Sequence, residues 1–159
     1  MEEMLNNEFG GMNEIYADAY QLTQDIKYLD TARKFSHKWL LNSMANKKDN
    51  LDNKHANTQV PKAVGYQRIA ELTHDTTYTT AAEFFWDRVV NHRSLSFGGN
   101  SRREHFPEKD DYISYAEERE GPETCNTYNM LKLTEGLFRI RPLAQYSDYY
   151  ERAMFNHIL

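Results

Sequence analysis

The sequence predicts an all-α protein built of stacked helical hairpins. An internal repeat, apolar residues at helical spacing and a long break between hairpins lead to this prediction. The repeat is the most specific of the three, because six residues return fifty positions later in the same order. Leu22, Thr23, Asp25, Tyr28, Ala32 and Phe35 recur as Leu72, Thr73, Asp75, Tyr78, Ala82 and Phe85. Each unit is therefore expected to be one helical hairpin.

Apolar side chains within each unit follow the period of an α-helix. In the second helix of each hairpin, Tyr, Ala and Phe occupy i, i+4 and i+7, and Trp39 or Val89 prolongs the stripe to i+11. The helix before it carries its own stripe, formed by Ile15, Ala19, Leu22 and Ile26. Asp25 and Asp75 fall between the two helices, where an aspartate suits a short turn and a helix cap.

A third, degenerate hairpin closes the chain. Met130, Leu133, Leu137 and Ile140 form one stripe, RPLA interrupts it, and a second helix follows from residue 145. Stacked hairpins either form an open solenoid or close into an α/α toroid. The sequence ends in apolar residues rather than in a polar capping unit. We therefore expect residues 1–159 to form about half of an (α/α)6 barrel, which self-associates through exposed apolar faces.

Composition excludes several classes of protein. The 19 Lys and Arg residues are outnumbered by 24 Asp and Glu residues, giving a net charge of −5 and no basic run that would follow nucleic-acid phosphates. No apolar run has membrane length, and the start MEEMLNNEFG lacks the pattern of a signal peptide. One cysteine allows no internal disulfide, so a cytoplasmic location is the default expectation. An exported protein whose leader precedes this sequence would look the same.

A long connection without apolar periodicity separates the second and third hairpins. Connections of this length inside a helical domain are usually functional or disordered. Gly98 and Gly99 are typical of a turn that lets the backbone approach a ligand closely. Glu104 follows in a charged stretch, and Pro122 is expected in the first turn of the next helix.

Polar residues gather at the expected starts of two helices. The third helix begins near His55, Asn57, Thr58 and Gln59, and the fifth begins near Glu123 and Cys125. In an α/α toroid, helix starts at one end of the inner ring converge on a common cleft, so these sets predict one pocket.

Each of these residues also has a purely structural interpretation. Glu123 could complement the helix dipole, and Cys125 could be a small buried hydrophobic residue. His55 could be a loop histidine, Asn57 a plain helix cap, and Glu104 a solvated charge. Spacing alone predicts a pocket and does not predict a reaction.

Several segments together resemble a known family. The strings HANTQVPK, AAEFFWDRVV, FGGNSRREHF, GPETCNTYNMLKLTEGLF and YYERAMFNHIL occur in this order. They resemble the β-L-arabinofuranosidase family of bacterial glycoside hydrolases, glycoside hydrolase family 127, over essentially the whole chain. The resemblance implies an (α/α)6 catalytic barrel followed by β-sandwich domains, with residues 94–121 as an active-site loop.

The resemblance also implies a retaining mechanism and roles for individual residues. Glu104 matches the general acid/base, and His55 and Glu151 match residues that bind the sugar. Glu123 and Cys125 match half of a zinc site, which two adjacent cysteines complete in the family. One of those cysteines is the nucleophile, whose thiolate attacks the anomeric carbon and gives a thioglycosyl intermediate.

This sequence departs from the family pattern after Cys125, because no further cysteine follows. The nucleophile, the rest of the barrel and the β-sandwich domains are therefore expected outside this chain. We expect a central fragment that has no glycosidase activity alone and binds zinc weakly or not at all. Its carbohydrate partner would be an arabinofuranoside or a related plant glycan. Two alternatives remain open: another α/α-toroid sugar enzyme such as an epimerase, and a non-catalytic helical-repeat scaffold or carbohydrate-binding module.

Overall fold

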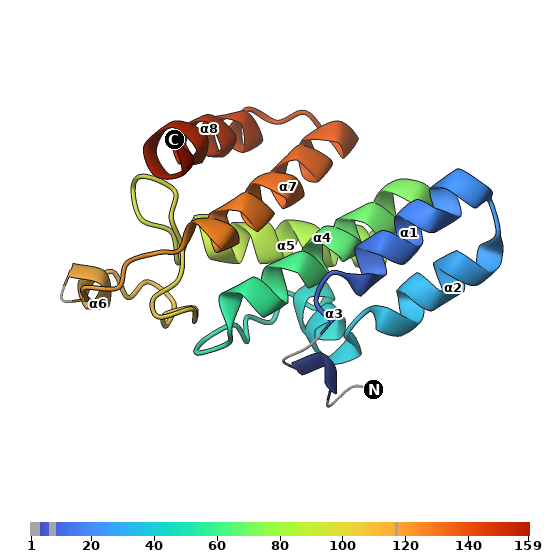
Figure 1. Cartoon of the computed structure of the whole chain (residues 1–159), viewed down its shortest axis with the longest axis horizontal. Helices are drawn as coiled ribbons and strands as arrows, with labels where there is room; N and C mark the ends of the chain where they lie inside the picture. Colours follow the sequence, from blue (N-terminus) through green and yellow to red (C-terminus); the bar gives the residue numbers. More distant parts are fainter. Residues whose placement is uncertain (1–3, 7–8, 117) are drawn as a thin grey trace.

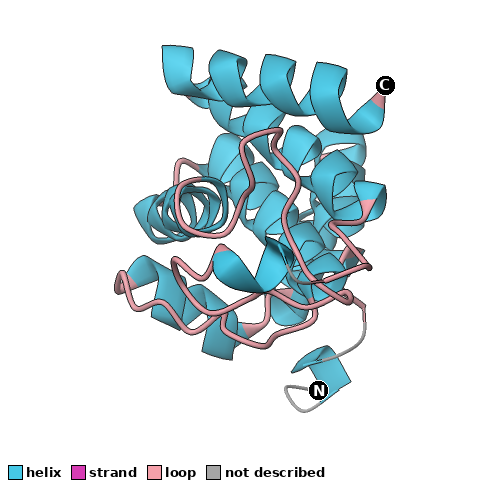
Figure 2. Cartoon of the chain, turned by 90° about the vertical axis from the view of Figure 1, so that its left-hand side faces the viewer, coloured by secondary structure: helices cyan, strands magenta, loops and turns pink. Residues whose placement is uncertain are grey.

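The computed structural model describes residues 4–6, 9–116 and 118–159, and within them it is helical (Figures 1 and 2). The α-helices are α1 Met12–Thr23, α2 Ile26–Phe35, α3 Lys38–Ala45, α4 Ala56–Thr73, α5 Thr76–Val90, α6 Ile113–Ala116, α7 Thr124–Ile140 and α8 Ala144–Ala153. A 3-10 helix, η1 (Met4–Asn6), precedes them, and a π-helix, η2 (Met154–Ile158), follows. The described residues form isolated β-bridges but no strand, which confirms the predicted all-α class.

The first helices of the three hairpins form one layer. Helix α4 packs between α1 and α7, and all three run in the same direction, from left to right in Figure 1. Helices α2, α5 and α8 return in the opposite direction, so each hairpin is antiparallel. The arrangement is that of a fragment of an α/α toroid, as predicted.

The two repeated hairpin corners have the same local geometry. Gln24 and His74 end α1 and α4 in the left-handed conformation, with φ of 58° and 56°. The next residue caps the following helix: Asp25 and Asp75 each accept a hydrogen bond from the backbone N–H two residues on, at 3.0 and 2.9 Å. The fifty-residue repeat is therefore a structural repeat, and the predicted caps are confirmed.

Glycines bring neighbouring helices of the first layer close together. A Cβ added at Gly65 on α4 would lie 2.1 Å from the Asn13 side chain on α1. A Cβ added at Gly136 on α7 would lie 2.2 Å from the Gln67 side chain on α4. The same contact therefore recurs at both seams, and it permits the short interaxial distance of closely packed helices.

Trp86 joins three helices at the centre of the molecule. Its indole N–H donates to Thr134 on α7 at 2.8 Å, so the buried polar atom is satisfied. Its ring meets Tyr146 and Tyr149 of α8 edge-on, with centroids 4.8 and 5.9 Å apart. Helix α5 is thereby fixed against the third hairpin.

One predicted stripe breaks where the structure inserts an additional helix. Helix α2 ends at Phe35 because Ser36 is extended, and α3 begins at Lys38. The sequence reading joined Trp39 to the stripe of α2, which is wrong: Trp39 lies on α3 with 42 % of its surface exposed. The short helix α3 was not expected.

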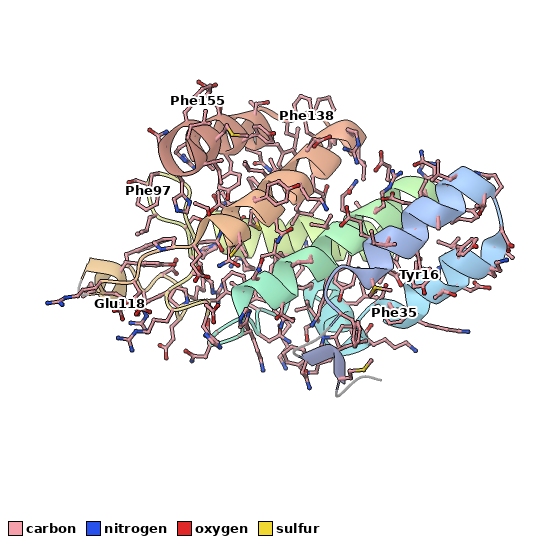
Figure 3. The ribbon with its side chains drawn as sticks, in the orientation of Figure 1. Tyr16, Phe35, Phe97, Glu118, Phe138 and Phe155 are labelled. Carbon is pink, nitrogen blue, oxygen red and sulfur yellow. The ribbon has the colours of Figure 1, made fainter. Side chains whose placement is uncertain are left out.

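Apolar residues line both outer edges of the hairpin stack. At one edge Ile15 is 60 % and Leu22 is 85 % exposed, so the predicted stripe of α1 faces outward rather than into the core. At the other edge Phe138 and Phe155 project from α7 and η2 (Figure 3). These are the exposed faces expected of a partial ring, while self-association through them stays a prediction. No helix among the described residues combines the length and hydropathy needed to cross a bilayer.

Candidate active site

The long connection, residues 91–123, lies beside the starts of α4 and α7, at the end of the molecule that faces the viewer in Figure 2. Buried Arg93 anchors it. Its guanidinium donates to Asp49 at 2.9 Å, to Asp52 and to the Pro107 carbonyl at 3.1 Å. A buried arginine with this many acceptors fixes the connection to the loop that precedes α4.

Tyr115 crosses the interior of the connection. Its hydroxyl donates to the Arg93 carbonyl at 2.9 Å and accepts from the backbone N–H of Ser101 at 3.0 Å. Burial raises the pKa of Tyr115, so the phenol keeps the proton that it donates. Ser101 itself has a positive φ of 98°, which is rare for a residue with a side chain.

The paired glycines serve packing within the protein. Gly98 has φ of +99°, and a Cβ there would lie 2.6 Å from Cβ of Ala153 on α8. A Cβ at Gly99 would meet the Phe97 ring at 2.6 Å and Pro122 at 2.8 Å. Figure 3 shows Phe97 beside the end of the last helix. Their close neighbours are α8, Phe97 and the segment before α7, and the expectation that these glycines approach a ligand stays a prediction.

The structure brings Glu104 and His55 together. His55 is the N-cap residue of α4, and the Glu104 carbonyl accepts from the N–H of the following Ala56 at 2.8 Å. The side chains meet with His55 Nε2 3.7 Å from Glu104 Oε2, and the His105 ring lies edge-on to the His55 ring, 5.2 Å away. Glu104 is 57 % exposed, so its carboxylate can reach a molecule outside the protein.

Glu123 and Cys125 form a second pair at the start of α7. Glu123 is the N-cap residue, but its side chain accepts no capping hydrogen bond, so it is not spent on the helix end. Cys125 is exposed, which contradicts the buried-hydrophobe interpretation. Burial of part of the thiol and the charge of Glu123 raise the pKa of Cys125. The sequence predicted Pro122 in the first turn of this helix. This prediction is wrong, because Pro122 lies before the N-cap residue Glu123.

The distance within this pair fits two ligands of one zinc ion. Cys125 Sγ lies 3.8 Å from Glu123 Oε2. Zinc–sulfur and zinc–oxygen bonds of about 2.3 and 2.0–2.2 Å at a tetrahedral angle place two such ligands about 3.5 Å apart. Within the described part of the chain, no group of three or more His, Cys, Asp and Glu could hold a metal. The chain therefore offers two donors, and Cys125 would lose its proton on binding.

Two asparagines of α7 connect the start of this helix with the long connection and with α4. Buried Asn126 donates to the Ser101 hydroxyl at 2.7 Å, which ties α7 to the long connection. The Asn129 side chain donates to the side-chain oxygen Oδ1 of Asn57 at 2.8 Å, which ties α7 to the first turn of α4. The two pairs thus belong to one connected end of the molecule, although no contact among described residues joins Glu104 to Cys125 directly.

His157 in η2 holds the start of α7 from the other side. Its Nε2 lies 3.1 Å from the Pro122 carbonyl, and its Nδ1 lies 2.8 Å from the Thr127 hydroxyl. Since a carbonyl can only accept, Nε2 carries the proton and Nδ1 accepts from the threonine in the neutral ring.

Glu151 lies apart from the other predicted residues. It is exposed on α8 and lines an apolar groove between α7 and α8. The other residues that line this groove are Thr134, Glu135, Phe138, Tyr146, Ser147, Tyr150, Met154 and Phe155. Among the described residues, no hydrogen bond or ion pair joins the Glu151 side chain to the long connection. Sequence reasoning also missed the supports of the site, Arg93, Tyr115 and Asn126, because no spacing pattern marks them.

Stacked antiparallel hairpins whose first helices form one layer define the chain as a fragment of an α/α toroid. The model of the β-L-arabinofuranosidase GH127 catalytic domain matches residues 1–159. The chain therefore belongs to glycoside hydrolase family 127. No curated protein sequence matches it.

Two solved structures of the family share this fold. A GH127 β-arabinofuranosidase, BT3674, is 23 % identical with a TM-score of 0.70, over 91 % of this chain and 24 % of its own. A GH127 β-L-arabinofuranosidase from Geobacillus stearothermophilus T6 is 16 % identical with a TM-score of 0.72, over 91 % of this chain and 27 % of its own. The chain thus spans about a quarter of the length of these relatives.

Proposed function

We propose that this chain contributes one part of the active site of a retaining β-L-arabinofuranosidase. In this proposal Glu104 is the general acid/base, Glu123 and Cys125 hold a zinc ion, and His55 and Glu151 contact the sugar. The nucleophile is a cysteine outside the chain. The substrate is an arabinofuranoside or a related plant glycan.

The observation that carries the proposal is the Glu123–Cys125 pair. Its 3.8 Å separation suits one zinc ion, and Glu123 is not used as a helix cap. Membership of family 127 also supports the proposal, because the resemblance to this family implies a zinc-bound thiolate nucleophile. The contact of Glu104 with His55 supports the second half of the proposal, because an acid/base needs a fixed position at an accessible surface.

Each residue of the proposed site has a defined role in the reaction. Glu104 donates its proton to the leaving oxygen of the glycoside and later removes a proton from the attacking water. His55, within 3.7 Å, orients the Glu104 carboxylate. Zinc, when bound, supplies a positive charge that keeps thiolates ionised near neutral pH. Most retaining glycosidases use a second carboxylate for the attack, whereas here sulfur takes that role.

Metal binding can be tested on the chain itself. Because only two donors are expected in the chain, titration to high concentrations of Co²⁺, a spectroscopic substitute for zinc, is expected to give a weak thiolate-to-metal absorption band. Cys125→Ser should abolish the band and Glu123→Gln should weaken it, whereas Glu108→Gln, an exposed acid of the long connection, should leave it unchanged. An equally strong band in Cys125→Ser would remove this residue from the metal site.

The role of Glu104 needs an enzyme of full length that contains this segment. Glu104→Gln should lower turnover of an aryl arabinofuranoside by about 10²–10⁴-fold while the sugar still binds. Glu108→Gln serves again as the control. Unchanged turnover in Glu104→Gln would refute the assignment, and the 159-residue chain alone is expected to give no turnover.

A further inference from the structure

The helices that carry the two proposed pairs are joined by a pair of side-chain amides to which the proposed mechanism gives no role. Asn57 lies in the first turn of α4, two residues after His55. Asn129 lies on α7, one helical turn after Cys125. Asn129 Nδ2 donates to Asn57 Oδ1 at 2.8 Å, across the seam between the two helices.

The amide pair connects the two helix starts that carry the proposed catalytic groups. Residues four apart lie on one face of an α-helix, so Asn129 shares the face of Cys125. From Asn129 the hydrogen bond leads to Asn57, and His55 two residues earlier contacts Glu104. A sugar that touches both Glu104 and the Cys125 side of the site would therefore lie over the amides.

The amide pair keeps free hydrogen-bonding capacity. An asparagine offers two N–H donors and a carbonyl oxygen that accepts twice. The bond between Asn57 and Asn129 leaves the Asn57 amino group and the Asn129 carbonyl oxygen without a partner among the described residues. Both side chains are partly exposed. By contrast, buried Asn13 donates to the Lys62 carbonyl at 3.0 Å and accepts from the N–H of Glu14 at 3.0 Å.

A purely structural role explains the pair less well. The α4–α7 seam is already held by the close contact at Gly136 and by the Arg139 guanidinium, which donates twice to Glu71 at 3.1 and 3.0 Å. An additional bond between two partly exposed amides at the open end of the seam adds little to stability. A free donor beside a free acceptor does match two neighbouring hydroxyl groups.

We propose that Asn57 and Asn129 form one recognition unit that binds two adjacent hydroxyl groups of the sugar and so selects the substrate. The Asn57 amino group donates to one hydroxyl oxygen, and the Asn129 carbonyl oxygen accepts from the other hydroxyl. This inference rests on the proposed function, because it places the sugar between Glu104 and Cys125. Asn57 and Asn129 are positioning residues and take no part in proton transfer.

The test is nuclear magnetic resonance on the ¹⁵N-labelled 159-residue chain with methyl β-L-arabinofuranoside as the probe. The side-chain NH₂ signals of Asn57 and Asn129 are expected to shift with a single dissociation constant. The NH₂ signal of Asn46, which donates within α3 to the Asn42 carbonyl, is the internal control. The 2-deoxy analogue of the probe should bind about two- to tenfold more weakly, because one hydrogen bond is lost.

Variants show whether the amides act as one unit. Asn57→Ala and Asn129→Ala should each weaken binding about two- to tenfold, and the double variant should weaken it little further. Each single variant should bind the probe and its 2-deoxy analogue with the same affinity. Asn46→Ala should retain wild-type affinity. If either variant fails to fold, the wild-type chain with the two ligands decides the question.

The outcomes separate this inference from the function on which it rests. Shifts at His55 and Glu104 without shifts of the Asn57 and Asn129 amides would overturn the inference and leave the sugar site in place. Equal affinity for the probe and its 2-deoxy analogue would also overturn it. No response of any signal up to the solubility limit would overturn both the inference and the sugar site of this chain.

Discussion

The hairpin corners and the long connection are both turns between helices, yet they are held in opposite ways. At the corners the decisive bonds are local: Asp25 and Asp75 bond to the backbone two residues on. In the long connection the decisive partners are distant in sequence, as in the bonds from Arg93 to Asp49 and from Asn126 to Ser101. A corner is therefore specified by its own residues, whereas the connection is specified by the fold around it.

This difference matters for the proposed acid/base role, because Glu104 lies in the connection and not at a corner. The φ of +67° at Glu104 and the position of its carboxylate depend on anchors elsewhere in the chain. Substitutions at those anchors should therefore have larger effects than substitutions at the corners.

The largest loss of stability is expected from Arg93→Ala. The change leaves the Asp49 and Asp52 carboxylates without their buried cation, and breaking a buried ion pair costs about 3–5 kcal/mol. Urea denaturation followed by circular dichroism measures the loss. Arg119→Ala, an exposed arginine of the same connection, is the control and should change stability by less than about 0.5 kcal/mol. Equal effects of the two variants would show that the bonds from Arg93 do not hold the connection in place.

Gly98→Ala should destabilise the protein by about 2–4 kcal/mol. The alanine would need a positive φ and its Cβ would overlap Ala153 of α8, where the contacting atoms include backbone. Gly121→Ala is the matched control, because nothing lies within 4 Å of the added atom. Thermal unfolding of both variants compares them, and a neutral Gly98→Ala would show that the connection can move away from α8.

Substitution of Glu71 tests the hydrogen bonds that join α4 to Arg139 of α7, a residue distant in sequence. Burial would raise the pKa of Glu71, but hydrogen bonds from Arg139, Gln67 and Arg68 outweigh burial and lower it to about 2. A depressed carboxyl pKa stabilises the fold above the unfolded value of 4.5, and this contribution is lost as the pH falls from 4.5 through about 2. With discounting for solvent screening it amounts to about 1–2 kcal/mol.

The Glu71→Gln variant should therefore lose stability at pH 7 and show a flatter acid limb than the parent. Glu135→Gln, at an exposed carboxylate that pairs with the same Arg139, provides the comparison and should change the acid limb little. Parallel stability curves for Glu71→Gln and the parent between pH 5 and 2 would contradict the shifted pKa.

The smallest effects are expected at the corners. Asp75→Ala removes one capping bond and should cost about 1 kcal/mol. Asp25→Ala should act in the same direction, because its geometry is the same. Asp30→Ala, on the exposed face of α2, should be neutral. The shifts in thermal midpoint of the three variants give the comparison, and a corner variant as damaging as Arg93→Ala would reverse the order argued here.

The same division explains what could be predicted from the sequence. Helices and caps of the repeat follow from periodic apolar residues and from an aspartate at a fixed offset, which are local signals. Helix α3 was missed because its eight residues hold too short a pattern and follow directly on α2. Spacing alone did not predict the contact of Glu104 with His55, since a positive φ and the anchors of the connection bring them together. The outward orientation of Ile15 likewise depends on which neighbours the hairpin has.

The position of His157 has a practical consequence for any shortened version of this protein. The imidazole braces the two residues that flank the Glu123–Cys125 segment, Pro122 and Thr127, although it lies near the other end of the sequence. A chain trimmed before His157 would lose the hydrogen bonds to the Pro122 carbonyl and the Thr127 hydroxyl. The first turn of α7 would then be less ordered. The C-terminal boundary of such a version therefore decides whether the start of α7, with the Glu123 carboxylate and the Cys125 thiol, keeps its ordered position.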